Sequence, residues 1–168
     1  RSIISREAAK TRRKQNEKFL SSRHGDFAAS RVVKILFERP IRMNENELAA
    51  IVVDAAYHIH TRLGPGVLEA VYQTVLAYEL RKRGLIVREE EAIPLVYEEI
   101  KLDKGFKADL IINDCLLIEL KSVETTLPVH KKQLLTYLKL TGIRLGLLIN
   151  FGAPLIKDGI TRLVNGLK

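Results

Sequence analysis

The chain has 168 residues, of which 46% are hydrophobic, and this length and composition suit one globular domain with a buried core. No apolar run approaches the roughly 18 residues of a membrane span and no secretory leader is found, so we expect a cytoplasmic protein without membrane contacts. The single cysteine, Cys115, excludes an internal disulfide, and no cysteine pair or helically spaced histidine pair predicts a zinc site.

The net charge of +8 is concentrated in the first quarter of the chain. Residues 1–42 hold 12 Lys and Arg against 4 Asp and Glu, whereas residues 43–168 hold 16 of each kind. The segment 1–42 is therefore predicted to be a basic extension, either a tether for phosphates or a loosely ordered segment with little role. Met43, the only methionine, stands at the junction, so the folded domain, residues 43–168, could begin there.

Two helices are predicted after this junction. Residues 45–63, "ENELAAIVVDAAYHIHTRL", carry apolar side chains at helical spacing and stop at Gly64-Pro65-Gly66. Residues 67–84 form a second amphipathic segment that ends at Gly84.

Strands are predicted at residues 85–90 and 92–102, followed by a hairpin of residues 105–112 and 115–123 around Asn113-Asp114. Pro128 opens a further helix that ends at Gly142, and residues 143–151 are typical of a buried strand. Residues 155–164 have no assigned type. The main order α-β-β-β-α-β predicts an α/β fold with a mixed, mainly antiparallel sheet flanked by helices.

The hairpin "DLIINDCLLIELK", residues 109–121, carries charges inside apolar strands. Its apolar residues are even-numbered on both strands and must share one face, so paired residue numbers sum to an even number. This predicts a three-residue loop or a bulge instead of a two-residue turn. A sum of 228 places Asp109 opposite Glu119 and Lys107 opposite Lys121, all on the other face. The even-numbered set is Phe106, Ala108, Leu110, Ile112, Leu116, Ile118 and Leu120.

Two carboxylates about 5 Å apart repel by about 3 kcal/mol at an effective dielectric constant near 20. A divalent cation such as Mg²⁺ or Mn²⁺ offsets this repulsion, because these ions prefer carboxylate oxygens. Lys121 follows Glu119 on the same face and places a positive charge where a water is activated or a phosphorus centre gathers negative charge. The alternative is a surface face on which Asp109 and Glu119 pair with the lysines.

At these residues the sequence resembles the PD-(D/E)XK nuclease superfamily, as "AD" at residues 108–109 and "ELK" at residues 119–121. Ala108 replaces the proline, which removes no ligand. "GVLEAVY", residues 66–72, matches the pattern for which the GxxExxY protein family is named. The resemblance runs from about Met43 to the C-terminus and implies a restriction-endonuclease-like core.

The resemblance also implies roles for individual residues. Asp109 and Glu119 would ligate the metal, joined by Glu69 on the second helix and, more weakly, by the backbone carbonyl of Leu120. Lys121 would orient the attacking water. Glu79 is the rival of Glu69, because it points nearer the middle of the same helical stripe.

The helix after the hairpin contains "QLLTY", which resembles the QxxxY motif of the exonuclease-like branch. Gln133 and Tyr137 share one helical face and would position the substrate. His130 lies on the same flank, where a solvated residue at the helix start is the simpler interpretation. His58 and His60 face different directions on their helix, which disfavours a metal role.

These observations predict a Mg²⁺- or Mn²⁺-dependent nuclease, with DNA favoured over RNA as its substrate. The absence of GxSxG, Walker, dinucleotide-glycine and HExxH motifs disfavours serine hydrolases, NTPases, oxidoreductases and zinc peptidases. Two alternatives stay open: a catalytically silent nucleic-acid-binding or scaffolding module on the same fold, and a phosphatase-like or nucleotide-directed activity at the same site. A homodimer would help so small a domain to cut both strands.

Overall fold

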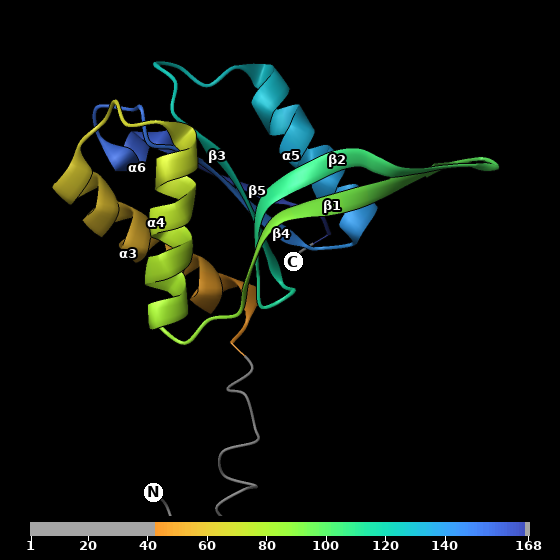
Figure 1. Ribbon diagram of the computed structural model, residues 1–168, viewed down its shortest axis with the longest axis horizontal. Helices are drawn as coiled ribbons and strands as arrows, with labels where there is room; N and C mark the ends of the chain where they lie inside the picture. Colours follow the sequence, from red (N-terminus) through yellow and green to blue (C-terminus); the bar gives the residue numbers. More distant parts are fainter. Residues whose placement is uncertain (1–42, 167–168) are drawn as a thin grey trace, which may run out of the picture. The chain divides into compact units, whose positions relative to one another are not determined.

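A computed structural model describes residues 43–166, and the predicted extension 1–42 lies outside the described residues. A five-stranded sheet with strand order β1-β2-β3-β4-β5 carries α3 and α4 on one side and α5 on the other (Figure 1). The elements are α3 (Glu45–Leu63), α4 (Glu69–Lys82), β1 (Val87–Tyr97), β2 (Ile100–Ile112), β3 (Leu116–Lys121), α5 (Pro128–Thr141), β4 (Leu145–Asn150), α6 (Ile156–Gly159) and β5 (Ile160–Val164).

The pair β3–β4 is parallel and the other three strand pairs are antiparallel. The prediction of an α/β fold with a mixed, mainly antiparallel sheet is therefore confirmed. Within residues 43–166, no helix combines the length and the apolar character that crossing a bilayer requires.

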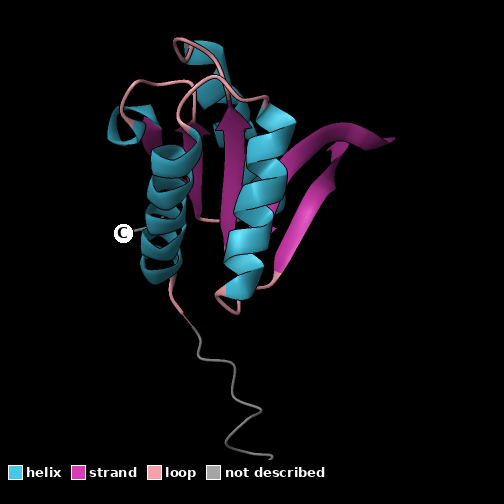
Figure 2. Cartoon of the chain, turned by 60° about the vertical axis from the view of Figure 1, so that its left-hand side comes forward, coloured by secondary structure: helices cyan, strands magenta, loops and turns pink. Residues whose placement is uncertain are grey.

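The first helix begins at a capping box. Asn44 Oδ1 accepts hydrogen bonds from the N–H groups of Asn46 and Glu47, both at 3.0 Å, and the Glu47 carboxylate accepts the N–H of Asn44 at 2.7 Å. Gly64 ends the helix with a φ of 68°, a conformation that glycine adopts at little cost. α3 and α4 then run side by side across the sheet (Figure 2).

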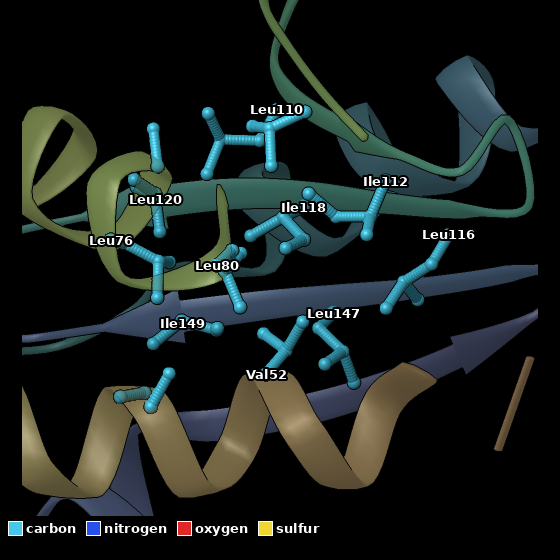
Figure 3. Close-up of a cluster of buried hydrophobic side chains, with 14 of the residues drawn as sticks. Val52, Leu76, Leu80, Leu110, Ile112, Leu116, Ile118, Leu120, Leu147 and Ile149 are labelled. Carbon is cyan, nitrogen blue, oxygen red and sulfur yellow. The ribbon is translucent and has the colours of Figure 1, made fainter. Parts of the chain in front are cut away.

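Each face of the sheet has its own apolar core. The first core joins α3 and α4 to the even-numbered residues of β3, and the second joins α5 to odd-numbered residues such as Leu117. Figure 3 shows ten labelled members of the first core: Val52, Leu76, Leu80, Leu110, Ile112, Leu116, Ile118, Leu120, Leu147 and Ile149. Each fully buried aliphatic side chain contributes about 1.5–3 kcal/mol, so β3 is held firmly from both sides.

The strand boundaries differ from the prediction in two places. The chain reverses at Glu98-Glu99, inside the segment predicted as one strand, and residues 100–112 form a single long strand through Gly105. Glu98 adopts a positive φ of 52°, and a glutamate in the sequence does not predict such a turn conformation. A Cβ at Gly105 would lie 3.2 Å from Leu95 Cβ, so close strand approach, and not a break, explains this glycine. Residues 155–164, which had no assigned type, form α6 and β5.

The register predicted for the β2–β3 hairpin is confirmed. The pairs Leu110–Ile118, Ile111–Leu117 and Ile112–Leu116 all sum to 228, and residues 113–115 form the three-residue loop. Asn113 and Asp114 adopt φ values of 48° and 56°, a conformation that Asn and Asp tolerate better than most residues. This register places Asp109 and Glu119 at the same level of the sheet.

Two details of the predicted face are wrong. Lys107 is not paired with Lys121, because the β2–β3 ladder ends at Leu110. On its other edge, Lys107 pairs with Ala92 of β1. Phe106 and Ala108 belong to the second core, although Leu110 and Ile112 belong to the first. The side chains of β2 switch faces at the level of Glu90 and Asp109. The β1–β2 ladder skips this pair of residues, and Glu90 has a φ of 52° there. Parity arguments assume a regular pleat, and the pleat is interrupted there.

Candidate active site

The candidate site lies where β2 leaves β3. Asp109 does not continue the ladder with backbone bonds; its Oδ2 accepts the backbone N–H of Leu120 at 2.7 Å. The carboxylate therefore occupies the gap between the two strands. Burial raises the pKa of Asp109, although the Leu120 N–H and the charge of Lys121 act in the opposite direction.

Glu119 is the most deeply buried carboxylate of the site, with 2% of its surface exposed. Its Oε1 accepts hydrogen bonds from Lys121 Nζ and Gln133 Nε2, both at 2.8 Å. Its Oε2 is also buried and has no hydrogen-bond partner among the residues that the structure describes. Burial, reinforced by the neighbouring charge of Asp109, raises the pKa of Glu119 from 4.5 to about 7.

Lys121 connects the acidic groups. Its Nζ donates to Glu119 Oε1 at 2.8 Å and to the carbonyl oxygen of Leu120 at 2.6 Å, and lies 3.6 Å from Glu69 Oε1. Burial alone would lower the pKa of Lys121, but the hydrogen bond to Glu119 and the surrounding carboxylates outweigh it and raise the pKa. The arrangement therefore favours the protonated, hydrogen-bond-donating form of Lys121.

The structure thus gathers the predicted Asp109, Glu119, Lys121 and Glu69, together with the backbone of Leu120. Within the described part of the chain, no group of three or more His, Cys, Asp or Glu side chains is arranged to hold a metal ion. The positively charged Nζ of Lys121 lies against the oxygens instead. Glu79 is not part of this group, and it lines a separate pocket between α3 and α4 with residues such as His58.

Gln133 and Tyr137 also reach the site, from α5. Gln133 Nε2 lies 2.8 Å from Glu119 Oε1 and 2.7 Å from the Tyr137 hydroxyl oxygen. Tyr137 is 4% exposed, and its ring centroid lies 5.4 Å from that of Phe106. In this arrangement the amide of Gln133 holds Glu119.

The histidines have local structural contacts. His130 Nδ1 accepts the N–H of Leu127 at 3.2 Å, at the start of α5. His58 lies 3.4 Å from Asp54, and the buried His60 is bonded through Nε2 to the carbonyl oxygen of Ala153 at 2.9 Å.

The segment "GVLEAVY" positions Glu69. Gly66 has a φ of 101°, and the buried Tyr72 donates its hydroxyl hydrogen to the Gly64 carbonyl at 2.5 Å. The ring of Tyr72 stacks on that of Phe151 with centroids 4.3 Å apart, and Ser122 donates to the Val67 carbonyl at 2.6 Å. These contacts fix the start of α4 beside the end of β3, which brings Glu69 to Lys121.

Three further residues of this region were not predicted from the sequence: Ser122, Gln73 and Asn150. Gln73 Nε2 lies 3.5 Å from the carbonyl oxygen of Asp109. The buried Asn150 bonds both the N–H and the carbonyl of Val123, at 3.0 and 2.8 Å, and so fixes the chain just after Lys121. The polar Asn150 at the end of the apolar strand "LGLLIN" could have marked it as a candidate site residue. Placing it beside Lys121, however, requires knowing that β4 pairs in parallel with β3.

Comparison with known proteins agrees with this geometry. The family model of the PD-(D/E)XK nuclease superfamily matches residues 46–163, which include α4, the β2–β3 hairpin and α5. Searches of the curated proteins and of the solved structures find no match. The matched segment spans more than half of the chain, and the chain therefore belongs to the PD-(D/E)XK nuclease superfamily.

Proposed function

We propose that this protein is a metal-dependent nuclease that hydrolyses phosphodiester bonds in DNA. Membership of the superfamily supports nuclease-type function in general. The observation that carries the finer proposal is Glu119, a buried carboxylate with one oxygen bonded to Lys121 and Gln133 and the other without a partner among the described residues. A buried, unpartnered carboxylate oxygen costs stability, and such a cost is typical of a functional site.

The donor set fits a divalent cation. Asp109, Glu119 and the Leu120 carbonyl offer the hard oxygen ligands that Mg²⁺ and Mn²⁺ prefer, and Glu69 lies close enough to Lys121 to join them from α4. The ammonium group of Lys121 already bonds Glu119 and the Leu120 carbonyl, which indicates that these oxygens favour a positive charge. When bound, the cation would supply Lewis-acid stabilisation of the charge on the phosphate oxygens.

The residues of the chain have distinct roles in this proposal. Hydrolysis joins a water oxygen to phosphorus and breaks one P–O bond, while the water loses a proton and the leaving oxygen gains one. Lys121 orients the attacking water and donates a hydrogen bond to the phosphate oxygens, on which negative charge builds up in the transition state. Asp109 is fixed by the Leu120 N–H, and Gln133 and Lys121 hold Glu119, so the carboxylates are oriented before the substrate arrives.

The substrate side of the proposal rests on charge. Residues 43–168 have equal numbers of acidic and basic residues, whereas residues 1–42 carry the whole excess of +8. We infer that the N-terminal segment contributes phosphate contacts.

We also infer that the domain belongs to the GxxExxY family within the superfamily and that the protein acts in the cytoplasm. A homodimer would let the protein cut both DNA strands, and size-exclusion chromatography with light scattering tests this oligomeric state.

The deciding experiment is a cleavage assay. The full chain and residues 43–168 are incubated with single-stranded, double-stranded and branched DNA and with RNA, with Mg²⁺, Mn²⁺ or EDTA. We expect metal-dependent cleavage of DNA that is lost in Asp109→Ala and Lys121→Ala. The full chain should also lose DNA affinity more steeply with added salt than residues 43–168 do, because it makes more phosphate contacts.

The second candidate function is a nucleic-acid-binding or scaffolding module without turnover. The balanced charge of residues 43–168 favours it, because nucleases that bind through their own groove are usually basic there. Binding without cleavage of every substrate and with both metals would establish this module in place of the nuclease.

A further inference from the structure

A pocket opens beside the candidate site, between the β1–β2 hairpin and α5. It has a volume of about 540 Å³ and is lined by Ala92, Gly105, Phe106, Lys107 and Tyr137. Pockets that hold small ligands have volumes of about 300–1,000 Å³ and combine apolar walls with a few polar groups. Figure 1 shows β1 and β2 extending together past the other strands.

The walls of the pocket are suited to a flat aromatic ligand with a nearby negative charge. Phe106 is only partly buried, so part of its ring stays accessible, and its ring is tilted by 55° from that of Tyr137. Lys107 is exposed and lies 3.0 Å from Glu90, which keeps its ammonium group close to the hairpin. A partly accessible aromatic ring and a lysine that line the same pocket are a combination that single-stranded nucleic acid uses, with a base on the ring and a phosphate on the cation.

The pocket is connected directly to the site. The Tyr137 hydroxyl bonds Gln133 at 2.7 Å, and the same amide bonds Glu119 at 2.8 Å, so one wall of the pocket is two hydrogen bonds from the buried carboxylate. A ligand in the pocket would therefore lie next to any phosphate held at Asp109 and Glu119.

We propose that this pocket is a subsite for one unstacked nucleobase of the substrate strand, with Phe106 as the stacking surface and Lys107 contacting the adjoining phosphate. The position of the subsite next to the cleaved phosphate rests on the proposed nuclease function. Since a base inside a duplex is already stacked on its neighbours, the subsite selects single-stranded, frayed or branched DNA over a fully paired duplex.

The test separates base recognition from cleavage. Binding of the full chain to fluorescent single-stranded oligonucleotides is measured by anisotropy in EDTA, with a normal strand and a strand of abasic residues of equal length. Phe106→Ala should weaken binding of the normal strand by about fivefold or more and leave the abasic strand within about twofold. Lys107→Ala should weaken both strands alike, because a phosphate contact does not depend on the base. Tyr78→Ala, which removes an exposed aromatic ring on α4, is the matched control and should change neither.

Phe106 contacts Tyr137, so each variant is checked by thermal unfolding. If Phe106→Ala is not folded, Phe106→Leu carries the test, because it keeps apolar volume and removes the aromatic face. The subsite would be overturned if the Phe106 substitution weakened binding of both strands equally, or of neither. It would also be overturned if the wild type did not bind the normal strand at low salt. If the protein cleaves DNA but the Phe106 substitution has no base-dependent effect on binding, the nuclease proposal stands and the subsite proposal is wrong. If the effect on binding is base-dependent but no cleavage occurs, the base-binding site stands and the proposed hydrolytic function is wrong.

Discussion

The carboxylate of Asp109 occupies the position of a strand partner for Leu120, whose backbone N–H it accepts at 2.7 Å. The side chain replaces a backbone carbonyl at the point where the β2–β3 ladder ends. One residue therefore closes the end of the sheet and supplies a carboxylate to the site. These two roles can be separated by substitution, because they depend on different properties of the side chain.

Asp109→Asn should lose activity and keep stability. Asparagine retains an oxygen that can accept the Leu120 N–H, but it carries no charge for a cation. We expect DNA cleavage to fall by about 100-fold or more, with no loss in the free energy of unfolding, because burial of the charged form of Asp109 is unfavourable. Asp109→Ala should lose the same activity and also about 1–3 kcal/mol of stability, because the Leu120 N–H loses its partner. Urea unfolding and cleavage rates measure the two effects, and equal stability of the two variants would contradict the structural role of Asp109.

Much of this arrangement could be predicted from the sequence, since the alternation of apolar residues fixes the register of the hairpin. The sum of 228 brings Asp109 and Glu119 to one level, and "ELK" then places Lys121 beside them. Periodicity could not predict the position of Lys107 or Phe106, because it contains no sign of the interruption at Glu90.

Contacts between residues far apart in the chain could not be predicted from the sequence patterns either. Asn150 fixes the chain after Lys121 only because β4 lies parallel to β3, and the sequence does not state which strands are neighbours. The hydrogen bond from the Gln133 amide to Glu119 was not predicted, because helical spacing gives a shared face without saying what that face contacts. The substrate contact of Gln133 stays a prediction.

Glu119 should make the stability of the folded protein depend on pH. Its pKa is raised from 4.5 to about 7, so between these values the folded protein binds more protons than the unfolded chain. The free energy of unfolding should therefore be highest near pH 4.5 and fall as pH rises to about 7, by on the order of 1–3 kcal/mol from this group. Glu119→Gln should lack this decrease, be more stable than the wild type at pH 8, and be inactive. Asp109 contributes with the same sign, because its pKa is also raised, and this part of the pH dependence stays in the variant.

The measurement is urea unfolding in metal-free buffer from pH 4.5 to 8. Glu99→Gln, a change at an exposed position of the β1–β2 turn, is the matched control and should follow the wild type. An unchanged pH profile in Glu119→Gln would show that burial of this carboxylate does not destabilise the folded protein.

Divalent cations should stabilise the wild type and remove much of its pH dependence. A ligand that binds only the folded state raises the free energy of unfolding by about 2.7 kcal/mol at 100 times its Kd. A cation on Asp109 and Glu119 keeps both carboxylates ionised, so the decrease between pH 4.5 and 7 should become smaller in saturating Mg²⁺ or Mn²⁺. Thermal unfolding with the metal, with EDTA, and with NaCl at the same ionic strength measures the effect. Equal stabilisation of Glu119→Gln by Mg²⁺ would place the cation elsewhere.

Gln133 should act on the reaction through Glu119. Its amide bonds Glu119 Oε1 at 2.8 Å, so Gln133→Leu leaves this oxygen with the Lys121 bond alone. We expect kcat to fall by about 10- to 100-fold, the usual cost of losing a group that orients a ligand, while KM changes little. Tyr137→Phe should have a smaller effect in the same direction, because it removes one hydrogen bond to the amide and keeps the ring against Phe106. Thr136→Ala, at an exposed position of the same helix, is the control. A raised KM with unchanged kcat would instead assign Gln133 to direct contact with the substrate, because only a group that binds the ground state and the transition state equally gives that pattern.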